Sequence, residues 1–323
     1  MEPLNILYII LALFAIEILY FKIADCYNIV DKPNHRSSHS IITIRGGGVL
    51  FSLASLIHFF AYGQLYPIFT IGLVLIAVIS FIDDLITLDN KARLIIHIIA
   101  VILMLFQLNL MTLSFYYLIV IGIFIIGTIN AYNFMDGING ITVSYSLITT
   151  LTLLNINLFI KYFISTEFLI VVTASLLVFG FYNFRTKAKT FAGDVGSVSI
   201  AFIIIFLVLK LIIATDNYAY ILLLLIYGLD TVCTIIFRLL RKENIFEAHR
   251  THFYQFLANE KKYSHVVISI LYAIVQLLIN IAVINYFSKS AAQTVFFGIL
   301  VTVLFLLLRF TTEGRSKLFG VQP

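Results

Sequence analysis

Eleven runs of predominantly apolar residues follow one another along the chain, and each run is 17 to 23 residues long. An α-helix needs about 20 apolar residues to cross the hydrocarbon core of a bilayer. The sequence therefore predicts an all-α fold, a polytopic integral membrane helical bundle with about 10–11 transmembrane helices. The predicted spans lie near residues 4–22, 46–62, 67–83, 94–112, 115–134, 138–157, 167–183, 196–214, 218–237, 265–287 and 292–309.

The composition excludes a soluble protein. Hydrophobic residues make up 61% of the 323 residues and charged residues only 11%, whereas about 25% of a typical soluble domain is charged. So few charged residues cannot form a polar surface around a soluble core, which excludes a soluble enzyme, a nucleic-acid binder and a disordered chain. We expect residues 1–323 to form a single transmembrane domain.

The lysines and arginines predict how the chain is oriented. If the first span runs from outside to inside, 18 of the 21 basic residues fall in the inner loops or the C-terminal tail. The N-terminus is then outside and the C-terminus cytoplasmic. The unusual polar residues gather at the same inner face, which favours an enzyme over a transporter or lipid flippase, because these place ionisable groups near mid-membrane. The active site is predicted to form from the cytoplasmic loops 23–45, 83–93, 130–140, 184–197 and 238–264.

The first inner loop carries basic residues ahead of three glycines. Lys32, Arg36, His39 and Arg45 precede the glycines at 46–48. Glycines allow close backbone approach, and the N–H groups at a helix start attract anions, so the loop is a candidate anion site. A positively charged inner loop with a glycine-rich helix start explains the same residues equally well.

Two adjacent carboxylates, Asp83 and Asp84, end the third span. Carboxylates at the end of an apolar helix are costly unless they bind a cation or pair with basic side chains. We favour chemistry with a metal or a phosphate, and a structural ion pair with Lys91 or Arg93 is the alternative.

The fifth span runs into Asn130, Asn133 and Asp136, which would share one face of a continuing helix. Amide and carboxylate oxygens suit Mg²⁺, and a capping or turn role is the alternative. Asp194, in Gly-Asp-Val-Gly-Ser before the eighth span, is also consistent with a helix cap. A third acidic position at the same membrane face favours one shared site.

The largest inner loop contains His249, His252 and Gln255, whose spacing of three predicts one helical face. Two histidines without a third ligand at Cys/His spacing argue against zinc. Arg250 between them favours contact with phosphate.

Several ionisable residues lie inside the predicted spans. For Asp230 a buried structural role and a functional role are equally good interpretations. His58, His97 and Glu17 are expected to find partners inside the bundle.

Taken together, these motifs resemble the polyprenyl-phosphate N-acetylhexosamine-1-phosphate transferases, the family of MraY-like and WecA-like enzymes. The resemblance extends from Asp31 to Gln255, most of the chain. It rests on five motifs in this order: Asp-x-Pro-Asn with Arg-Gly-Gly-Gly, Asp-Asp, Asn-x-x-Asn-x-x-Asp-Gly, Gly-Asp-x-Gly-Ser and His-Arg-x-His-x-Tyr-Gln.

The resemblance implies a reaction and its participants. A polyprenyl phosphate, such as undecaprenyl phosphate, attacks a UDP-N-acetylamino sugar, UMP leaves, and a lipid-linked pyrophosphoryl sugar forms. Mg²⁺ is implied as the cofactor, with Mn²⁺ as an alternative. The implied location is the bacterial cytoplasmic (inner) membrane, where such enzymes begin the synthesis of O-antigen, teichoic acid, capsule or peptidoglycan. A second copy of the chain is a candidate partner.

The resemblance also implies roles for individual residues. Asp194 matches the metal ligand and Asn133 a second one, and Phe191 matches the aromatic ring that stacks on uracil. Asn139 stands where the family commonly has Asp. The implied catalytic residues are Asp83, Asp84, Asp194 and His249. The implied substrate-binding residues are Lys32, Arg45, Asn130, Asp136, Asn139, Phe191, Arg250 and His252.

The last motif indicates a branch of the family. His-Arg-x-His-x-Tyr-Gln looks more like the enzymes that initiate O-antigen and other surface polysaccharides than the peptidoglycan branch. We therefore expect UDP-GlcNAc, UDP-GalNAc or a 6-deoxy relative as donor. A phospho-N-acetylmuramoyl-pentapeptide transferase is the closest alternative.

Overall fold

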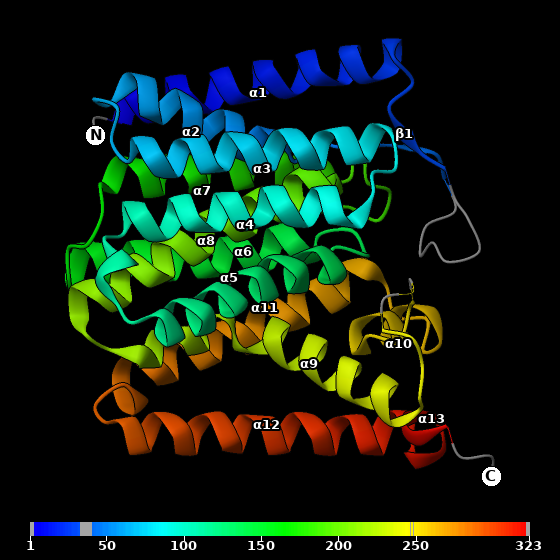
Figure 1. The fold of residues 1–323 in the computed structure, drawn as a ribbon. Coiled ribbons are helices and arrows are strands. Elements are labelled where there is room, and N and C mark those ends of the chain that lie inside the picture. Colours follow the sequence, from blue (N-terminus) through cyan, green and yellow to red (C-terminus); the bar gives the residue numbers. More distant parts are fainter. Residues whose placement is uncertain (1–2, 33–40, 246, 248, 321–323) are drawn as a thin grey trace.

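The structure is a computed structural model that describes residues 3–32, 41–245, 247 and 249–320. Figure 1 shows long helices running side by side, with the N-terminus at one end of the bundle and the C-terminus at the other. In this part of the chain ten helices are long and apolar enough to cross a membrane, and a shorter apolar helix covers Val49–Ala61. The prediction of an all-α polytopic membrane bundle is confirmed, whereas the end that faces the cytoplasm stays a prediction.

The α-helices are α1 (Pro3–Cys26), α2 (Val49–Ala61), α3 (Pro67–Leu85), α4 (Asn90–Gln107), α5 (Phe115–Met135), α6 (Ile141–Phe159), α7 (Thr166–Asn183), α8 (Gly193–Thr215), α9 (Leu225–Leu240), α10 (Phe253–Asn259), α11 (His265–Ala282), α12 (Ala291–Glu313) and α13 (Arg315–Phe319). Short 3₁₀ segments, η1 (Leu110–Thr112) and η2 (Tyr218–Leu224), precede α5 and α9, and a π-helical turn, η3 (Val283–Phe287), follows α11. Two short strands, β1 (Val30–Asp31) and β2 (Thr43–Ile44), pair antiparallel with Val30 opposite Ile44.

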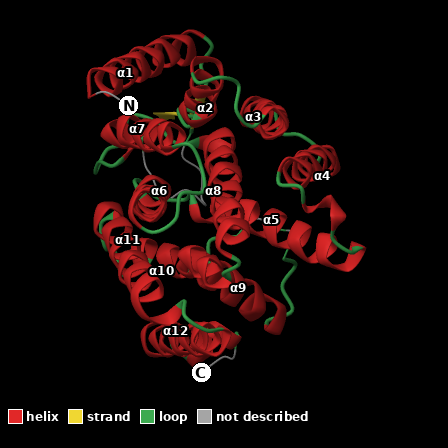
Figure 2. Cartoon of the chain, turned by 90° about the vertical axis from the view of Figure 1, so that its left-hand side faces the viewer, coloured by secondary structure: helices red, strands yellow, loops and turns green. Residues whose placement is uncertain are grey.

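Helix α8 forms the centre of the bundle. It packs against α2, α3, α5 and α6, and Figure 2 shows it between α7 and α5, with α1 and α12 at opposite edges. Its sequence is apolar all round, which is the pattern of a buried helix, and every residue from 195 to 209 is buried. Because α8 begins at Gly193, this central helix holds Asp194 in its first turn, at one end of the bundle.

The predicted span 218–237 is helical throughout but changes type, from 3₁₀ in η2 to α-helix in α9 after Leu224. Figure 1 shows α9 running obliquely toward α13. A change of helix type inside a membrane protein frees backbone groups that need partners from neighbouring helices. Gln276 of α11 supplies them, because its Oε1 accepts from the N–H of Ile226 at 3.1 Å and its Nε2 donates to the carbonyl of Leu222 at 3.0 Å.

The predicted span 46–62 begins later than expected, since α2 starts only at Val49. The preceding glycines pair with another segment instead: the N–H of Gly47 donates to the carbonyl of Phe191 at 3.0 Å, and that of Gly48 to Ala192 at 3.2 Å. A β-carbon on Gly48 would lie only 2.4 Å from the Cα of Gly196. Glycine is therefore required where α2 and α8 meet.

We expect Gly48→Ala to separate the start of α2 from α8 and to cost about 1–3 kcal/mol of stability, the usual price of overpacking. The measurement is the thermal unfolding midpoint of the purified protein in detergent. Gly122→Ala in α5 is the matched control, because a β-carbon there meets nothing within 4 Å. Equal midpoints for the two variants would contradict this account of the contact.

Candidate active site

Two segments almost 150 residues apart are joined by backbone hydrogen bonds. The N–H of Phe191 donates to the carbonyl of Ile44 at 2.8 Å, and Ile44 forms a parallel bridge with Thr190. This pairing continues into the glycine contacts described above. It brings Arg45, at the end of the first inner loop, to the first turn of α8.

Asp84 holds the start of α8 from outside that helix. Its two carboxylate oxygens accept from the backbone N–H of Asp194 at 2.9 Å and of Val195 at 3.0 Å. Free N–H groups at a helix start carry partial positive charge, which a carboxylate stabilises. Its side chain is fully buried, and Arg45 Nε donates to it at 2.6 Å. The capping role considered for Asp194 thus falls to Asp84.

Asp194 lies between two arginines. Its Oδ1 is 3.3 Å from a terminal nitrogen of Arg45, and its Oδ2 is 3.1 Å from one of Arg93. The other terminal nitrogen of Arg93 lies 2.6 Å from Asp83. Three carboxylates and two guanidinium groups therefore form one network. The ion pair of Asp83 with Arg93, the structural alternative considered from the sequence, is part of this network.

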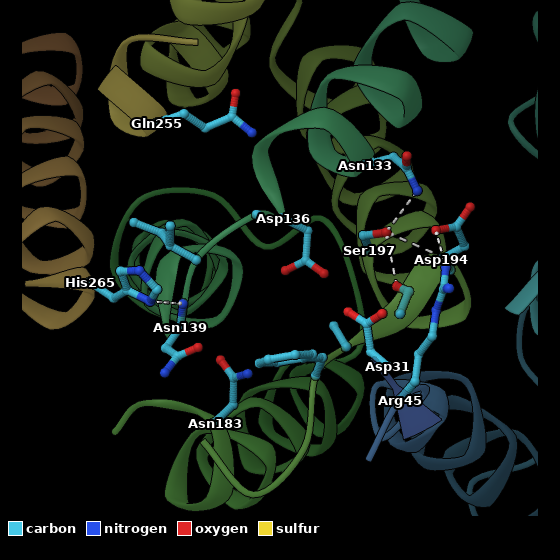
Figure 3. Close-up of a pocket in the computed structure, with 15 residues that line it drawn as sticks. Asp31, Arg45, Asn133, Asp136, Asn139, Asn183, Asp194, Ser197, Gln255 and His265 are labelled. Atoms are coloured by element: carbon cyan, nitrogen blue, oxygen red, sulfur yellow. Dashed lines mark hydrogen bonds and ion pairs between the residues drawn. The ribbon is translucent and has the colours of Figure 1, made fainter. Parts of the chain in front are cut away.

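A polar cavity of about 230 Å³ adjoins this network. In Figure 3 the carboxylate of Asp136 faces the cavity, with Asn133 and Asp194 on one side and Asn139 on the other. Asn133 donates through Nδ2 to Ser197 at 3.2 Å. Helix α5 extends to Met135, so Asn130 and Asn133 are helical as predicted, and Asp136 follows the last turn.

The charge of Asp136 is suppressed by its surroundings. Burial, with a smaller contribution from the nearby carboxylates of Asp194 and Asp84, raises the pKa of this carboxyl to about 7, whereas Arg45 opposes the shift. An acid with a perturbed pKa inside a polar cavity is typical of a functional site. A cation or a hydrogen-bond donor entering this cavity would favour the ionised form.

A second cavity, of about 680 Å³, opens beside the first. Both cavities are lined by Asn133, Asp136, Gly137 and Gln255. Apolar side chains of three helices form much of the second wall, among them Leu94, Ile126 and Ile235. The polar cavity thus adjoins a larger and more apolar cavity.

The histidine motif borders the second cavity, and the prediction that it forms one helical face is wrong. His252 is the N-cap of α10, and His249 lies in the loop before it. The buried carboxylate of Asp230 accepts from the N–H groups of Phe253 at 2.9 Å and Tyr254 at 3.2 Å, so it holds the start of α10. These backbone bonds explain why the helix begins at Phe253.

The two histidine rings lie close together, with centroids 4.9 Å apart. His252 is buried, and its Nδ1 lies 3.4 Å from Asp230. Burial, together with the neighbouring His252 and Arg238, lowers the pKa of His249 to about 4. His249 is therefore neutral at physiological pH. Its Nδ1 lies 3.1 Å from the hydroxyl of Thr251, so Nε2 is the ring nitrogen left for a ligand.

The structure brings most of the predicted site residues together. Arg45, Asn133, Asp136, Asn139, Phe191 and Asp194 line the first cavity, and Asn130, His249 and His252 line the second. Asp83 and Asp84 join them through the two arginines. Lys32 and Arg250 are exposed and line neither cavity. The motif residues Asn34, Arg36 and His39 lie outside the described residues.

Several residues at the site were missed by sequence reasoning. The hydroxyl of Tyr20 donates to the backbone carbonyl of Arg45 at 2.5 Å and so holds the first inner loop from α1. Asn183 accepts from the N–H of Gly140 and donates to Thr190, both at 2.8 Å. His265 also lines the polar cavity, as does Gln255, which the spacing of the histidine motif had already singled out. No comparable sequence signal indicated His265.

The donor set at the polar cavity fits a hard divalent cation. Among the described residues no group of three or more His, Cys, Asp or Glu side chains forms a ready-made metal cage. Mg²⁺ commonly binds through one or two protein oxygens, several waters and substrate phosphates. The carboxylate of Asp194 and the amide oxygen of Asn133, at the same cavity, match that pattern, and Mn²⁺ accepts similar ligands.

Comparison with known proteins agrees with this arrangement. Residues 66–212 match the model of glycosyl transferase family 4. The chain is 29% identical over 253 residues to the probable undecaprenyl-phosphate N-acetylglucosaminyl 1-phosphate transferase of Bacillus subtilis, covering 72% of this chain and 70% of that protein. It is 28% identical over 201 residues to the phospho-N-acetylmuramoyl-pentapeptide-transferase of Leuconostoc citreum, covering 52% and 61%.

A helical membrane bundle in which acidic side chains pair with arginines at one end is consistent with a membrane-embedded transferase. The matched region contains Asp83, Asp84, Asn133, Asp136 and Asp194. These similarities support membership of the polyprenyl-phosphate hexosamine-1-phosphate transferase family, within glycosyl transferase family 4.

Replacing Asp230 with Ala should destabilise the histidine loop. The N–H groups of Phe253 and Tyr254, and the hydroxyl of Tyr272 at 2.6 Å, would lose a buried acceptor, at a cost of about 3 kcal/mol or more. Thermal unfolding in detergent measures the loss. Asp25→Ala, at an exposed position near the end of α1, is the control, and an equal midpoint for both variants would refute the anchoring role.

Asp136→Asn should stabilise the ligand-free protein as pH rises. The pKa of Asp136 is about 7 in the fold, against 3.8 as its ordinary value, so the native state retains a proton that the unfolded state has lost. As pH rises from about 4 to 7, ionisation of Asp136 therefore lowers the unfolding free energy of the wild type. The asparagine variant does not ionise and avoids this loss. Unfolding midpoints at pH 4 and pH 8 test it, and a variant-to-wild-type difference that does not grow with pH would contradict it.

Proposed function

We propose that this protein transfers an N-acetylamino-sugar 1-phosphate from a UDP-sugar to undecaprenyl phosphate in the bacterial cytoplasmic membrane. UMP is released and a lipid-linked pyrophosphoryl sugar is formed. The observation that carries the proposal is the position of Asp194, which lies between Arg45 and Arg93 at the polar cavity, next to a larger and more apolar cavity that shares four lining residues with it. Such an arrangement suits two phosphorylated substrates, one soluble in water and one in lipid.

The two cavities suggest how the substrates are arranged. The UDP-sugar occupies the polar cavity, where Phe191 supplies an aromatic face and Asn133, Asp136 and Asn139 supply polar contacts. The lipid phosphate occupies the larger cavity, whose apolar wall of Leu94, Ile126 and Ile235 accepts an isoprenoid chain. The phosphates meet where the cavities join.

The reaction is a phosphoryl transfer in which one bond forms and one breaks. An oxygen of the acceptor phosphate attacks the β-phosphorus of the nucleotide sugar, and the bond from that phosphorus to the bridging oxygen breaks. UMP carries the electron pair away. Because a phosphate monoester is largely ionised at neutral pH, the attacking oxygen needs no strong base.

Positioning and neutralisation of charge are the main demands of this chemistry. Arg45 and Arg93 are held in place by Asp84, Asp83 and Asp194 and present fixed positive charge to the phosphates. His249, neutral and close to His252, offers a hydrogen-bond donor from the side of the larger cavity. Mg²⁺, held by Asp194 and Asn133, would add charge neutralisation on the phosphate oxygens.

The donor proposed first is UDP-GlcNAc or a related UDP-N-acetylhexosamine, for the synthesis of a surface polysaccharide such as O-antigen or teichoic acid. The similarity to the Bacillus subtilis protein, whose name specifies N-acetylglucosaminyl 1-phosphate, supports this donor. The similarity to the Leuconostoc citreum protein keeps the muramoyl-pentapeptide donor as the second candidate. Purified protein, undecaprenyl phosphate and Mg²⁺, incubated with each UDP-sugar in turn, should release UMP only with the true donor.

In this assay Asp194→Asn should lower turnover by a hundredfold or more, about 3 kcal/mol of barrier, because a carboxylate at the phosphates is lost. The matched control is Asp216→Asn at the other end of α8, where the residue has a left-handed backbone that asparagine also tolerates. This variant should keep turnover within about twofold of wild type. Near-normal turnover of Asp194→Asn would remove Asp194 from the proposed mechanism, and a labelled sugar transported without UMP release would favour a transporter.

A further inference from the structure

The sequence predicts that His97, a histidine of α4 inside a span, has a hydrogen-bond partner within the bundle, and the structure differs from this prediction. His97 lines the larger cavity and is only 4% exposed. Its Nε2 is shielded from solvent and has no hydrogen-bond partner among the described residues. Leaving a buried polar atom unpaired is unfavourable, so packing alone does not explain a histidine at this position.

The place of His97 along α4 relates it to the phosphates. It follows Arg93 by four residues, so the two side chains share one face of the helix. A rise of 1.5 Å per residue puts His97 about 6 Å further into the bundle than Arg93. Both residues line the larger cavity, together with His249 and His252. His97 thus lies on the route from the charged network toward the apolar wall.

Two other buried histidines allow a comparison. His252 lines the same cavity and has no hydrogen-bond partner at either ring nitrogen among the described residues, but its Nδ1 lies 3.4 Å from the carboxylate of Asp230. His58 of α2 is 2% exposed, but its Nε2 lies 3.4 Å from the hydroxyl of Ser165, and it lines neither of the two cavities. His58 therefore has a partner inside the protein, as the sequence predicts for both His58 and His97. Among the described residues Nε2 of His97 has no partner, and the residue itself lines the larger cavity.

We propose that His97 is a binding residue for the lipid substrate and hydrogen-bonds a non-bridging oxygen of its phosphate. The imidazole contacts the lipid where the phosphate is joined to the isoprenoid chain. Arg93, one helical turn closer to Asp194, contacts the charged phosphate oxygens. This inference rests on the proposed function for the identity of the lipid. The chemistry that His97 recognises is a phosphate monoester on an apolar chain.

Binding of farnesyl phosphate to the purified full-length protein in detergent tests the proposal directly. The variants are His97→Leu, which removes both ring nitrogens, and His97→Gln, which restores a polar N–H group. A hydrogen bond to a charged group is lost in His97→Leu, so the Kd for farnesyl phosphate should rise about tenfold or more. His97→Gln should stay within about threefold of wild type, and the Kd for farnesol, which lacks the phosphate, should change little in any variant.

His58→Leu is the matched control, since it deletes an equally buried imidazole that lies away from the cavities. It should leave the Kd for farnesyl phosphate unchanged even where it lowers the unfolding midpoint. An unchanged Kd in His97→Leu, an equal loss in His58→Leu, equal losses for farnesol and farnesyl phosphate, or no binding of farnesyl phosphate by wild type would each overturn the proposal.

Turnover separates this inference from the proposed function. With a UDP-sugar that supports UMP release, His97→Leu should raise the KM for undecaprenyl phosphate about tenfold and leave the KM for the UDP-sugar within twofold. A purely structural role would change both constants together or only the unfolding midpoint. If wild type binds farnesyl phosphate but releases no UMP from any UDP-sugar, the transferase function fails, whereas the role of His97 still stands or falls on the binding constants.

Discussion

The contact of Asp84 with the start of α8 is the interaction on which the site depends. One buried carboxylate satisfies two backbone N–H groups of α8 and also holds Arg45. A buried carboxylate is expensive unless its charge is compensated and its oxygens are hydrogen-bonded, and here both conditions are met by separate parts of the chain. The third helix, the first inner loop and the central helix are therefore fixed to one another at a single point.

This arrangement leaves Asp194 available in a way that a simple helix cap would not be. Because Asp84 supplies the cap, the side chain of Asp194 is turned toward Arg45 and Arg93 and is partly exposed at 19%. Both arginines are already oriented by a carboxylate when a substrate arrives. Charges that are ordered in advance need not reorganise during the reaction, which is how fixed groups lower a barrier to phosphoryl transfer.

Much of the fold was predictable from the apolar runs, because each run is long enough to cross a bilayer and is followed by polar residues. The convergence of Asp83, Asp84, Asn133, Asp136 and Asp194 also followed from their predicted position at the same membrane face, at the ends of the third, fifth and eighth spans. The change from 3₁₀ helix to α-helix before α9 was not predictable, since η2 is as apolar as the helix that follows it. The backbone groups freed there are satisfied by Gln276, which is some 50 residues further along the chain.

The individual roles of ionisable residues inside the spans are harder to predict than their positions. Asp230, His58 and His97 have a similar sequence context, an ionisable residue within a largely apolar helix. The first accepts backbone N–H groups of α10, the second meets Ser165, and the third borders a cavity with an unpaired nitrogen. Since the membrane penalises any unpaired polar group, each such residue needs a partner, but only the tertiary arrangement decides whether that partner is the protein or a ligand.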